Sequence, residues 1–146
     1  MVQYPRHYHA EAVAHAGTDE TWETVASEHK TECSIPEAYE GTGEAFSPED
    51  FFLLSLQNCF VATFKVYAEH LKLDYESIKV SADLIVDIEQ DKGPVMKRVE
   101  MNIDLYGVID EMKAENFVNK ALEDGFIFNS VITDVEPRIT FHEGAA

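Results

Sequence analysis

The longest apolar stretch of the chain, residues 48–71, has the pattern of a single long helix. Ser47 is a favourable N-cap, and Pro48 suits the first helical position. Glu49 and Asp50 complement the positive end of the helix dipole. A helix that is apolar all round must be buried all round, which predicts a long buried central helix. The apolar side chains that cover its circumference are Phe51, Phe52, Leu53, Leu54, Leu56, Phe60, Val61, Phe64, Val66 and Tyr67.

Alternation of apolar and polar positions before this helix predicts short strands. Residues 7–15 alternate in this way, and residues 21–35 can supply two more strands. A hairpin turn is expected at residues 17–20, and regular structure is expected to break between residues 36 and 43. The first third of the chain is therefore predicted to consist of strands.

Two longer strands and another helix are predicted after residue 71. Residues 77–88 and 95–105 alternate on either side of a turn, which is the pattern of a hairpin with one wet face. A helix that begins near Asp110 has one apolar side and a natural stop at Gly125. Residues 135–143 predict a final strand. The apolar side of the second helix consists of Ala114, Phe117, Val118, Ala121 and Leu122.

The order of these elements predicts an α+β fold. The length favours a single domain covering residues 1–146. One sheet can cover one side of the long helix, and the second helix can cover part of another. In so short a chain the remaining apolar surface needs a second subunit. We therefore expect a homodimer with the long helices near its centre.

Composition restricts the partners of this protein. The 146 residues include 28 acidic and 11 basic side chains, a formal net charge of −17, and 45% of them are hydrophobic. This charge would repel phosphate backbones and anionic membranes, so no nucleic-acid or membrane role is expected. Residues 1–15 lack a signal-peptide core, and no run is expected to reach the length of a membrane span. A cytoplasmic location is the default expectation.

Thiols and metal ligands are few. Cys33 and Cys59 have neither the number nor the spacing of a disulfide framework or a zinc site, so reduced thiols are expected. His7, His9 and Glu11 share one face of a predicted strand. Nothing else completes a metal site there, and a solvated or interface face is the favoured interpretation. No metal and no cofactor is therefore expected.

The sequence around Cys59 resembles a known family. The stretch SPEDFFLLSLQNCFVATF, with Glu49 ten residues before Cys59, is similar to the OsmC/Ohr family, as are the strand-rich first third, the hairpin and Asn129-Ser130-Val131. The resemblance covers nearly the whole chain. It implies an OsmC-like fold, in which antiparallel sheets pack around a long central helix in an intertwined homodimer with two sites at the subunit interface. It also implies a thiol-dependent reductase of organic hydroperoxides.

Two of the four catalytic features of that family are matched. Cys59 matches the peroxidatic cysteine, and Glu49 matches the glutamate after the proline. The family's arginine falls at Thr18, and its resolving cysteine falls at Gly125. Burial among apolar groups disfavours the reactive thiolate, so without an adjacent cation Cys59 is expected to react slowly. Without a second cysteine, an external thiol must resolve a sulfenic acid at Cys59.

Two functions from different classes remain open. The first is a cysteine-based peroxidase that reduces a small apolar hydroperoxide with an external thiol. The second is a non-catalytic protein of the same fold that binds a small apolar ligand at the dimer interface. A cation at the Cys59 sulfur, supplied by Arg6 or Arg98, would favour the first, and a wholly apolar surrounding would favour the second. The expected pocket residues are Phe52, Leu56, Phe60 and Thr63.

Each candidate also has a structural interpretation. Cys59 can be a buried core residue, because free cysteine is among the most buried residue types. Glu49 can be a first-turn carboxylate that stabilises the helix dipole. Cys33 is interpreted as structural, the alternative being that it replaces the missing resolving thiol.

Overall fold

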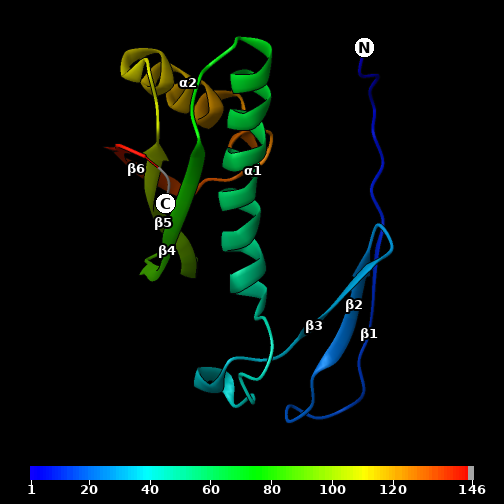
Figure 1. Ribbon diagram of the computed structural model, residues 1–146. Helices are drawn as coiled ribbons and strands as arrows, with labels where there is room; N and C mark the ends of the chain where they lie inside the picture. The colour runs from blue at the N-terminus through cyan, green and yellow to red at the C-terminus, as the bar shows by residue number, and fades with distance from the viewer. Residues whose placement is uncertain (145–146) are drawn as a thin grey trace. The chain divides into compact units, whose positions relative to one another are not determined.

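The computed structural model describes residues 1–144, which form two compact units (Figure 1). The first unit comprises residues 1–51, and the second begins at Phe52. The boundary falls just after the first turn of helix α1 (Pro48–His70). Each unit is described by itself.

The first unit contains a three-stranded antiparallel sheet. Its strands β1 (Ala10–Val13), β2 (Trp22–Ala26) and β3 (His29–Cys33) lie in the order β1-β2-β3, with Ala10 opposite Ala26 and Trp22 opposite Cys33. The strands expected here are therefore confirmed. A short 3-10 helix, η1 (Glu37–Tyr39), occupies the segment that was expected to lack regular structure. Within this unit only Cys33 and Ser34 of the described residues are buried.

Helix α1 begins with a reciprocal cap. The Asp50 N–H donates to Ser47 Oγ at 3.0 Å, and the Ser47 N–H donates to Asp50 Oδ2 at 2.9 Å. This arrangement satisfies two backbone donors at the helix start, as a capping box does. It confirms Ser47 as the N-cap. The helix ends at His70, one residue before the expected end.

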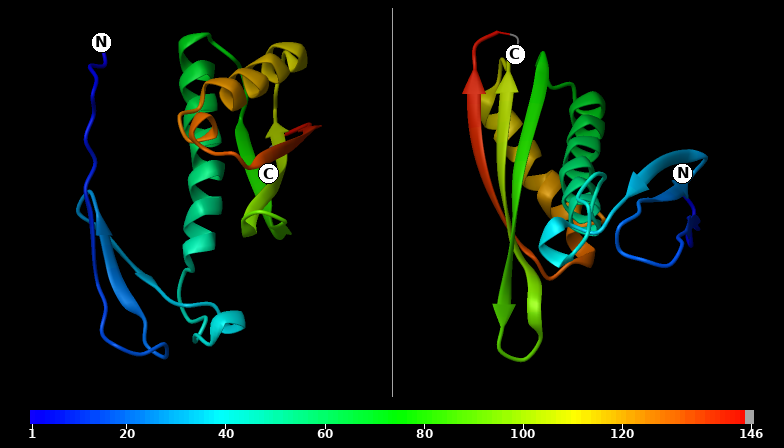
Figure 2. Two further views of the ribbon diagram at one scale, coloured as in Figure 1. Left: turned by 180° about the vertical axis from the view of Figure 1, so that it is seen from behind. Right: turned by 90° about the horizontal axis from the view of Figure 1, so that it is seen from below.

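The second unit places two helices on one face of a three-stranded sheet (Figure 2). Strands β4 (Ser77–Glu89) and β5 (Gly93–Tyr106) form the expected antiparallel hairpin. Helix α2 (Glu111–Asp124) and the 3-10 helix η2 (Phe128–Ser130) follow. Strand β6 (Asp134–His142) then pairs with β5 in parallel.

The parallel pair corrects part of the predicted architecture. The fold is α+β as expected, but the expectation of purely antiparallel sheets is wrong for β5 and β6. Strand β5 leads into α2, which crosses the face of the sheet before β6 begins. Such a crossover returns the chain in the same direction, whereas a tight turn would return it antiparallel.

The core of the second unit lies between the sheet and its two helices. Helix α2 starts at its N-cap Asp110, whose carboxylate accepts a hydrogen bond from the Lys113 N–H, as the sequence predicts. Helix α1 contributes a single stripe of four buried residues, spaced one turn apart. The buried apolar residues are Leu56, Phe60, Phe64 and Ala68 of α1, Leu73 after it, Val99, Met101, Ile103 and Leu105 of β5, and Ala114, Phe117, Val118 and Ala121 of α2.

The alternation of burial predicted along β4 stops before its end. A β-bulge shifts the register between Ile85 and Val86. Val86 is 42% exposed and Ile88 is 72% exposed, although the alternation expected over residues 77–88 puts both on the same face as Leu84. The extra residue is Lys97 of β5, because Ile85 pairs with Arg98 and Val86 with Met96. Strand β4 keeps its own two-residue period, but among the described residues its contacts with the core end at Leu84.

Helix α1 differs from expectation in two further respects. By length and composition it could cross a membrane, so the expectation that no segment reaches this length is wrong. Outside its stripe of four buried residues, its side chains are half-buried or exposed within one chain. Burial on all sides is therefore not achieved by a single copy of the chain.

Candidate functional site

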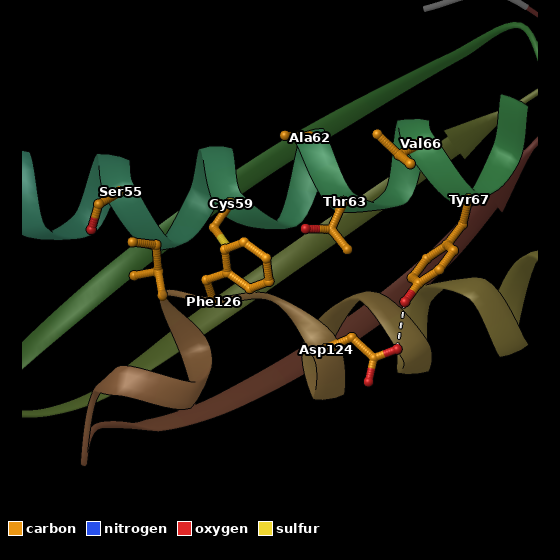
Figure 3. A pocket seen from close by; sticks show the side chains of 9 residues that line it. Ser55, Cys59, Ala62, Thr63, Val66, Tyr67, Asp124 and Phe126 are labelled. Atoms are coloured by element: carbon orange, nitrogen blue, oxygen red, sulfur yellow. Dashed lines mark hydrogen bonds between the residues drawn. The ribbon is translucent and has the colours of Figure 1, made fainter. Parts of the chain in front are cut away.

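A cavity of about 690 Å³ lies beside α1 in the second unit (Figure 3). One wall is α1, and the other is the segment that ends α2 and follows it. The α1 wall consists of Ser55, Cys59, Ala62, Thr63, Val66 and Tyr67, and the opposite wall of Asp124, Phe126 and Ile127. Most of these side chains are apolar, so the cavity suits a molecule with an apolar body.

Two neighbouring stripes of α1 divide core from cavity. We call Leu56, Phe60, Phe64 and Ala68 the core stripe, and Ser55, Cys59, Thr63 and Tyr67 the cavity stripe. Residues four apart lie above one another on a helix, so each stripe forms a continuous row. The cavity stripe is more polar than the core stripe, and it carries the thiol.

Cys59 is half-buried, and its sulfur faces the backbone of Gly125. A Cβ placed on Gly125 would lie 2.9 Å from the Cys59 Sγ. The expected helix end is confirmed, because the Gly125 N–H donates to the Ala121 carbonyl at 3.1 Å. The glycine is not left-handed, however: its φ is −61° and its ψ is 130°. What requires glycine here is the close approach of the sulfur, together with Phe128 Cδ2 at 2.7 Å from the same Cβ position.

Tyr67 and Asp124 form the polar part of the cavity. The Tyr67 hydroxyl donates to the Asp124 carboxylate, which joins the two walls (Figure 3). This hydrogen bond, more than burial or the charge itself, raises the pKa of the Tyr67 phenol. The Lys120 Nζ lies over the Tyr67 ring, 5.3 Å from its centroid, without lining the cavity.

Only one of the four residues expected to line the pocket faces the cavity. Thr63 lines the cavity as expected. Leu56 and Phe60 are instead fully buried in the core stripe, and Phe52 packs against the same core. The reason is the helical period, since 52, 56 and 60 follow one another at intervals of four and point at the sheet.

Glu49 lies in the first turn of α1. Its Oε2 atom is buried and accepts no hydrogen bond from the described residues. A carboxylate oxygen without a donor is costly to bury. The position therefore suits a group that receives a further partner, as well as one that complements the helix dipole.

No cation lies along the cavity wall in the described part of the chain. Arg98, one of the two candidates for this role, donates from Nε to Glu100 Oε1 at 3.4 Å on β5. Arg6, the other, belongs to the first unit, where it lies over the Tyr8 ring. Thr18 lies in the first unit as well.

Cys33 and the histidine cluster also belong to the first unit. Burial, reinforced by the charges of Glu49 and Asp50, raises the pKa of the Cys33 thiol above its usual value. His9 Nε2 lies 3.3 Å from Glu11 Oε1, and both side chains are exposed. Within residues 1–144, no three His, Cys, Asp or Glu side chains form a group that could hold a metal ion.

Sequence reasoning missed most of the cavity residues. Ser55 and Tyr67 could have been found, because each lies at a multiple of four residues from Cys59. Asp124 and Phe126 could not, because their place depends on how the end of α2 packs beside α1. The site and fold together define a small α+β protein that presents one thiol to an apolar cavity.

Comparison with known proteins agrees with this class. The family model for OsmC-like protein matches residues 41–140, and the chain belongs to the OsmC-like family. A comparison with curated proteins finds no match. Among solved structures, an OsmC-like protein of unknown function from Vibrio cholerae is 19% identical with a TM-score of 0.81, over 93% of this chain and 100% of that one.

Two further structures have names that refer to hydroperoxides. The organic hydroperoxide resistance protein OsmC from Legionella pneumophila is 19% identical with a TM-score of 0.69, over 95% of this chain and 98% of that one. The organic hydroperoxide resistance protein OhrB of Bacillus subtilis is 20% identical with a TM-score of 0.62, over 94% and 98%. At these identities the likeness shows the fold alone.

Proposed function

We propose that this protein is a thiol-dependent reductase of organic hydroperoxides, with Cys59 as its nucleophile. The observation that carries the proposal is the half-buried Cys59 thiol on the wall of an apolar cavity large enough for a small organic molecule. Membership of the OsmC-like family supports it. So do the names of the hydroperoxide resistance proteins that share the fold.

The chemistry requires an external reductant that supplies two thiol groups. The Cys59 thiolate attacks the outer oxygen of the hydroperoxide, an S–O bond forms, the O–O bond breaks, and the leaving alkoxide takes a proton to become an alcohol. Cys59 is oxidised by two electrons to the sulfenic acid, and the peroxide is reduced by two. A first external thiol displaces water and forms a mixed disulfide with Cys59. A second external thiol then attacks the sulfur of the first one in the mixed disulfide. Cys59 is released as a thiol, and the two external thiols leave joined by a disulfide bond.

We propose that the working form is an intertwined homodimer. Within one chain α1 exposes apolar side chains outside the core stripe, with Val66 53% exposed on the cavity wall. The first unit has almost no buried apolar residues, and small sheets need such a surface for stability. A second copy would cover both. We accordingly interpret α1 as the central helix of a dimer in the cytoplasm, rather than as a membrane span.

The dimer also accounts for Glu49 as a site residue. Glu49 and Cys59 are ten residues apart on α1, so their backbones are separated by about 15 Å along the helix axis. A glutamate cannot reach the sulfur over that distance within its own helix. We propose that the Glu49 carboxylate acts at the Cys59 of a second copy, where its buried Oε2 finds a donor.

The lining of the cavity also supports a second candidate. Because no lysine or arginine lines it in residues 1–144, a protein that binds a small apolar ligand without chemistry fits the same observations. Gly125, in place of a second thiol beside Cys59, favours this function as well. Turnover separates the two candidates.

The deciding experiment is consumption of cumene hydroperoxide in the presence of dithiothreitol. We expect the wild type and Cys33→Ala to consume it with similar rates, and Cys59→Ser to be inactive. Circular dichroism of each variant controls for folding. Equal rates for the wild type and Cys59→Ser would reject the peroxidase and leave the binding protein.

A further inference from the structure

The cavity has chemically different ends along α1. Cys59 and Tyr67 are two helical turns apart, so about 12 Å of helix separates the thiol from the phenol. Between them the wall is formed by Ala62, Thr63 and Val66. Figure 3 shows the Tyr67–Asp124 pair away from Cys59 and Phe126 along this wall. A molecule that reaches both groups must therefore be elongated.

The Tyr67 end of the cavity carries a negative charge that is held in place. The Asp124 carboxylate lines the cavity and uses one oxygen to accept from the Tyr67 hydroxyl. A carboxylate can accept several hydrogen bonds, so this contact leaves it capacity for a further partner. The phenol ring beside it already has the Lys120 Nζ over one face, 5.3 Å from the ring centroid, so the carboxylate is the group that a ligand cation would meet.

The charges around this end favour a cation over an anion. The chain as a whole carries a net charge of −17. Lys120 lies over the Tyr67 ring and does not line the cavity. The positive charge of Lys120 reduces the negative potential around Asp124, but the carboxylate remains the charged group on the cavity wall. An anionic head group would meet a like charge there.

We propose that the cavity binds elongated amphipathic molecules with an apolar chain and a positively charged head group, and that Asp124 selects the head. The apolar chain lies along Ala62, Thr63 and Val66 and ends at Cys59. The inference rests on the proposed function only in taking this cavity as the substrate site. It makes fatty-acid carboxylates poor ligands and alkylammonium-type molecules good ones.

The test compares three probes with ten-carbon chains: decyltrimethylammonium, decanol and decanoate. Each is added below its micellar concentration, at low salt, while iodoacetamide alkylates Cys59 at mildly alkaline pH. The rate of alkylation is followed on the Cys59 peptide by mass spectrometry, so protection reports binding at this cavity. Asp124→Asn removes the charge, and Glu123→Gln makes the same charge change at the exposed neighbouring position, which does not line the cavity.

We expect decyltrimethylammonium to protect best and decanoate worst, with half-protecting concentrations about tenfold apart. In Asp124→Asn the ratio should fall below about threefold, and in Glu123→Gln it should stay near the wild-type value. An unchanged ratio in Asp124→Asn would overturn the inference, because the net charge of the chain would then explain the preference. Equal protection by all probes, or none by any, would also overturn it.

Turnover of cumene hydroperoxide, measured on the same protein variants without iodoacetamide, separates the two proposals. If turnover fails while the order of the probes and the effect of Asp124→Asn hold, the peroxidase is rejected and the head-group selection stands. If turnover holds while protection of Cys59 does not depend on the head group of the probe, only the selection is rejected.

Discussion

The core stripe and the cavity stripe of α1 are offset by one residue, yet they differ in burial and in polarity. Leu56, Phe60 and Phe64 are fully buried against the sheet and α2. One position earlier in each turn, the chain has the hydroxyl, thiol, hydroxyl and phenol of Ser55, Cys59, Thr63 and Tyr67. One helix therefore holds the second unit together on one row and presents chemical groups on the next.

The apolar residues of α1 outside the core stripe fall into two groups. Phe52, Leu53, Val61 and Tyr67 pack at the edge of the core, whereas Val66 lines the cavity and is 53% exposed in the single chain. The apolar character of Val66 is not required for the core. It is required if a ligand or a second copy covers Val66, so this position and the core stripe can be disturbed separately.

Phe64→Ala should produce the largest effect on stability. Removing a fully buried aromatic ring costs about 3–5 kcal/mol of unfolding free energy, because the transfer energy is lost and a cavity remains. Its neighbour Thr63→Ala should change stability by less than about 1 kcal/mol. Urea unfolding followed by circular dichroism measures both. Similar losses for the two variants would show that the rows are not energetically distinct.

Val66→Glu should break the proposed dimer while leaving the single chain folded. Val66 is exposed on the cavity wall within one chain, so a charge there meets water in a monomer. In the proposed dimer the second copy would close the cavity over Val66, and the charge would be enclosed and unpaired. Sedimentation at micromolar concentration should show a dimer for the wild type and a monomer for the variant. The control Glu69→Gln, at another exposed position of α1, should remain dimeric. A monomeric wild type would contradict the dimer directly.

Gly125→Cys should allow a disulfide to form with Cys59. The position of a Cβ on residue 125, 2.9 Å from Sγ, matches the separation of about 3 Å between a Cβ and its partner's sulfur in a disulfide. The backbone at φ −61° accepts any residue. The same crowding should lower the stability of the reduced variant by about 1–3 kcal/mol, as in Gly125→Ala.

One equivalent of cumene hydroperoxide, followed by mass spectrometry under non-reducing conditions, tests the disulfide. Gly125→Ala serves as the matched control, because it adds the Cβ without the thiol. A Gly125→Cys chain that keeps two free thiols after oxidation would show that Cys59 does not reach residue 125, or does not react.

The smallest effect is expected in the titration of Tyr67. Because the hydrogen bond to Asp124 raises the pKa of the phenol, its contribution to stability is complete below pH about 10 and is lost as the pH rises through the folded value. Asp124→Asn should shift one tyrosine to ionise at lower pH, seen in the ultraviolet difference spectrum. Unchanged titration curves would mean that the Tyr67–Asp124 contact does not form in solution.

The sequence predicted well what depends on local periodicity. The cap at Ser47, the apolar side of α2 and the outline of every strand follow from side-chain spacing along one segment. The parallel placement of β6 did not, because direction depends on the path of α2 over the sheet. The bulge between Ile85 and Val86 leaves no mark in the alternation.

The candidate site divides in the same way. Cys59 and Thr63 were identified from α1 alone, and Ser55 and Tyr67 were within reach of the same four-residue rule. Asp124 required knowledge of packing between two helices. The sequence placed Phe60 in the pocket because an aromatic residue next to the thiol can belong to either stripe. Phe60 belongs to the core stripe because the sheet packs against that side of α1, which the sequence of α1 alone does not determine.

The most direct test of the account is the oxidation state of Cys59 after one equivalent of cumene hydroperoxide in the absence of reductant. We predict a sulfenic acid that dimedone traps on the Cys59 peptide, no adduct on Cys33, and conversion of Cys59 to the sulfinic acid when peroxide is in excess. A disulfide between Cys33 and Cys59 would contradict the structural interpretation of Cys33. A Cys59 that stays reduced would contradict the central claim, that this thiol is the nucleophile.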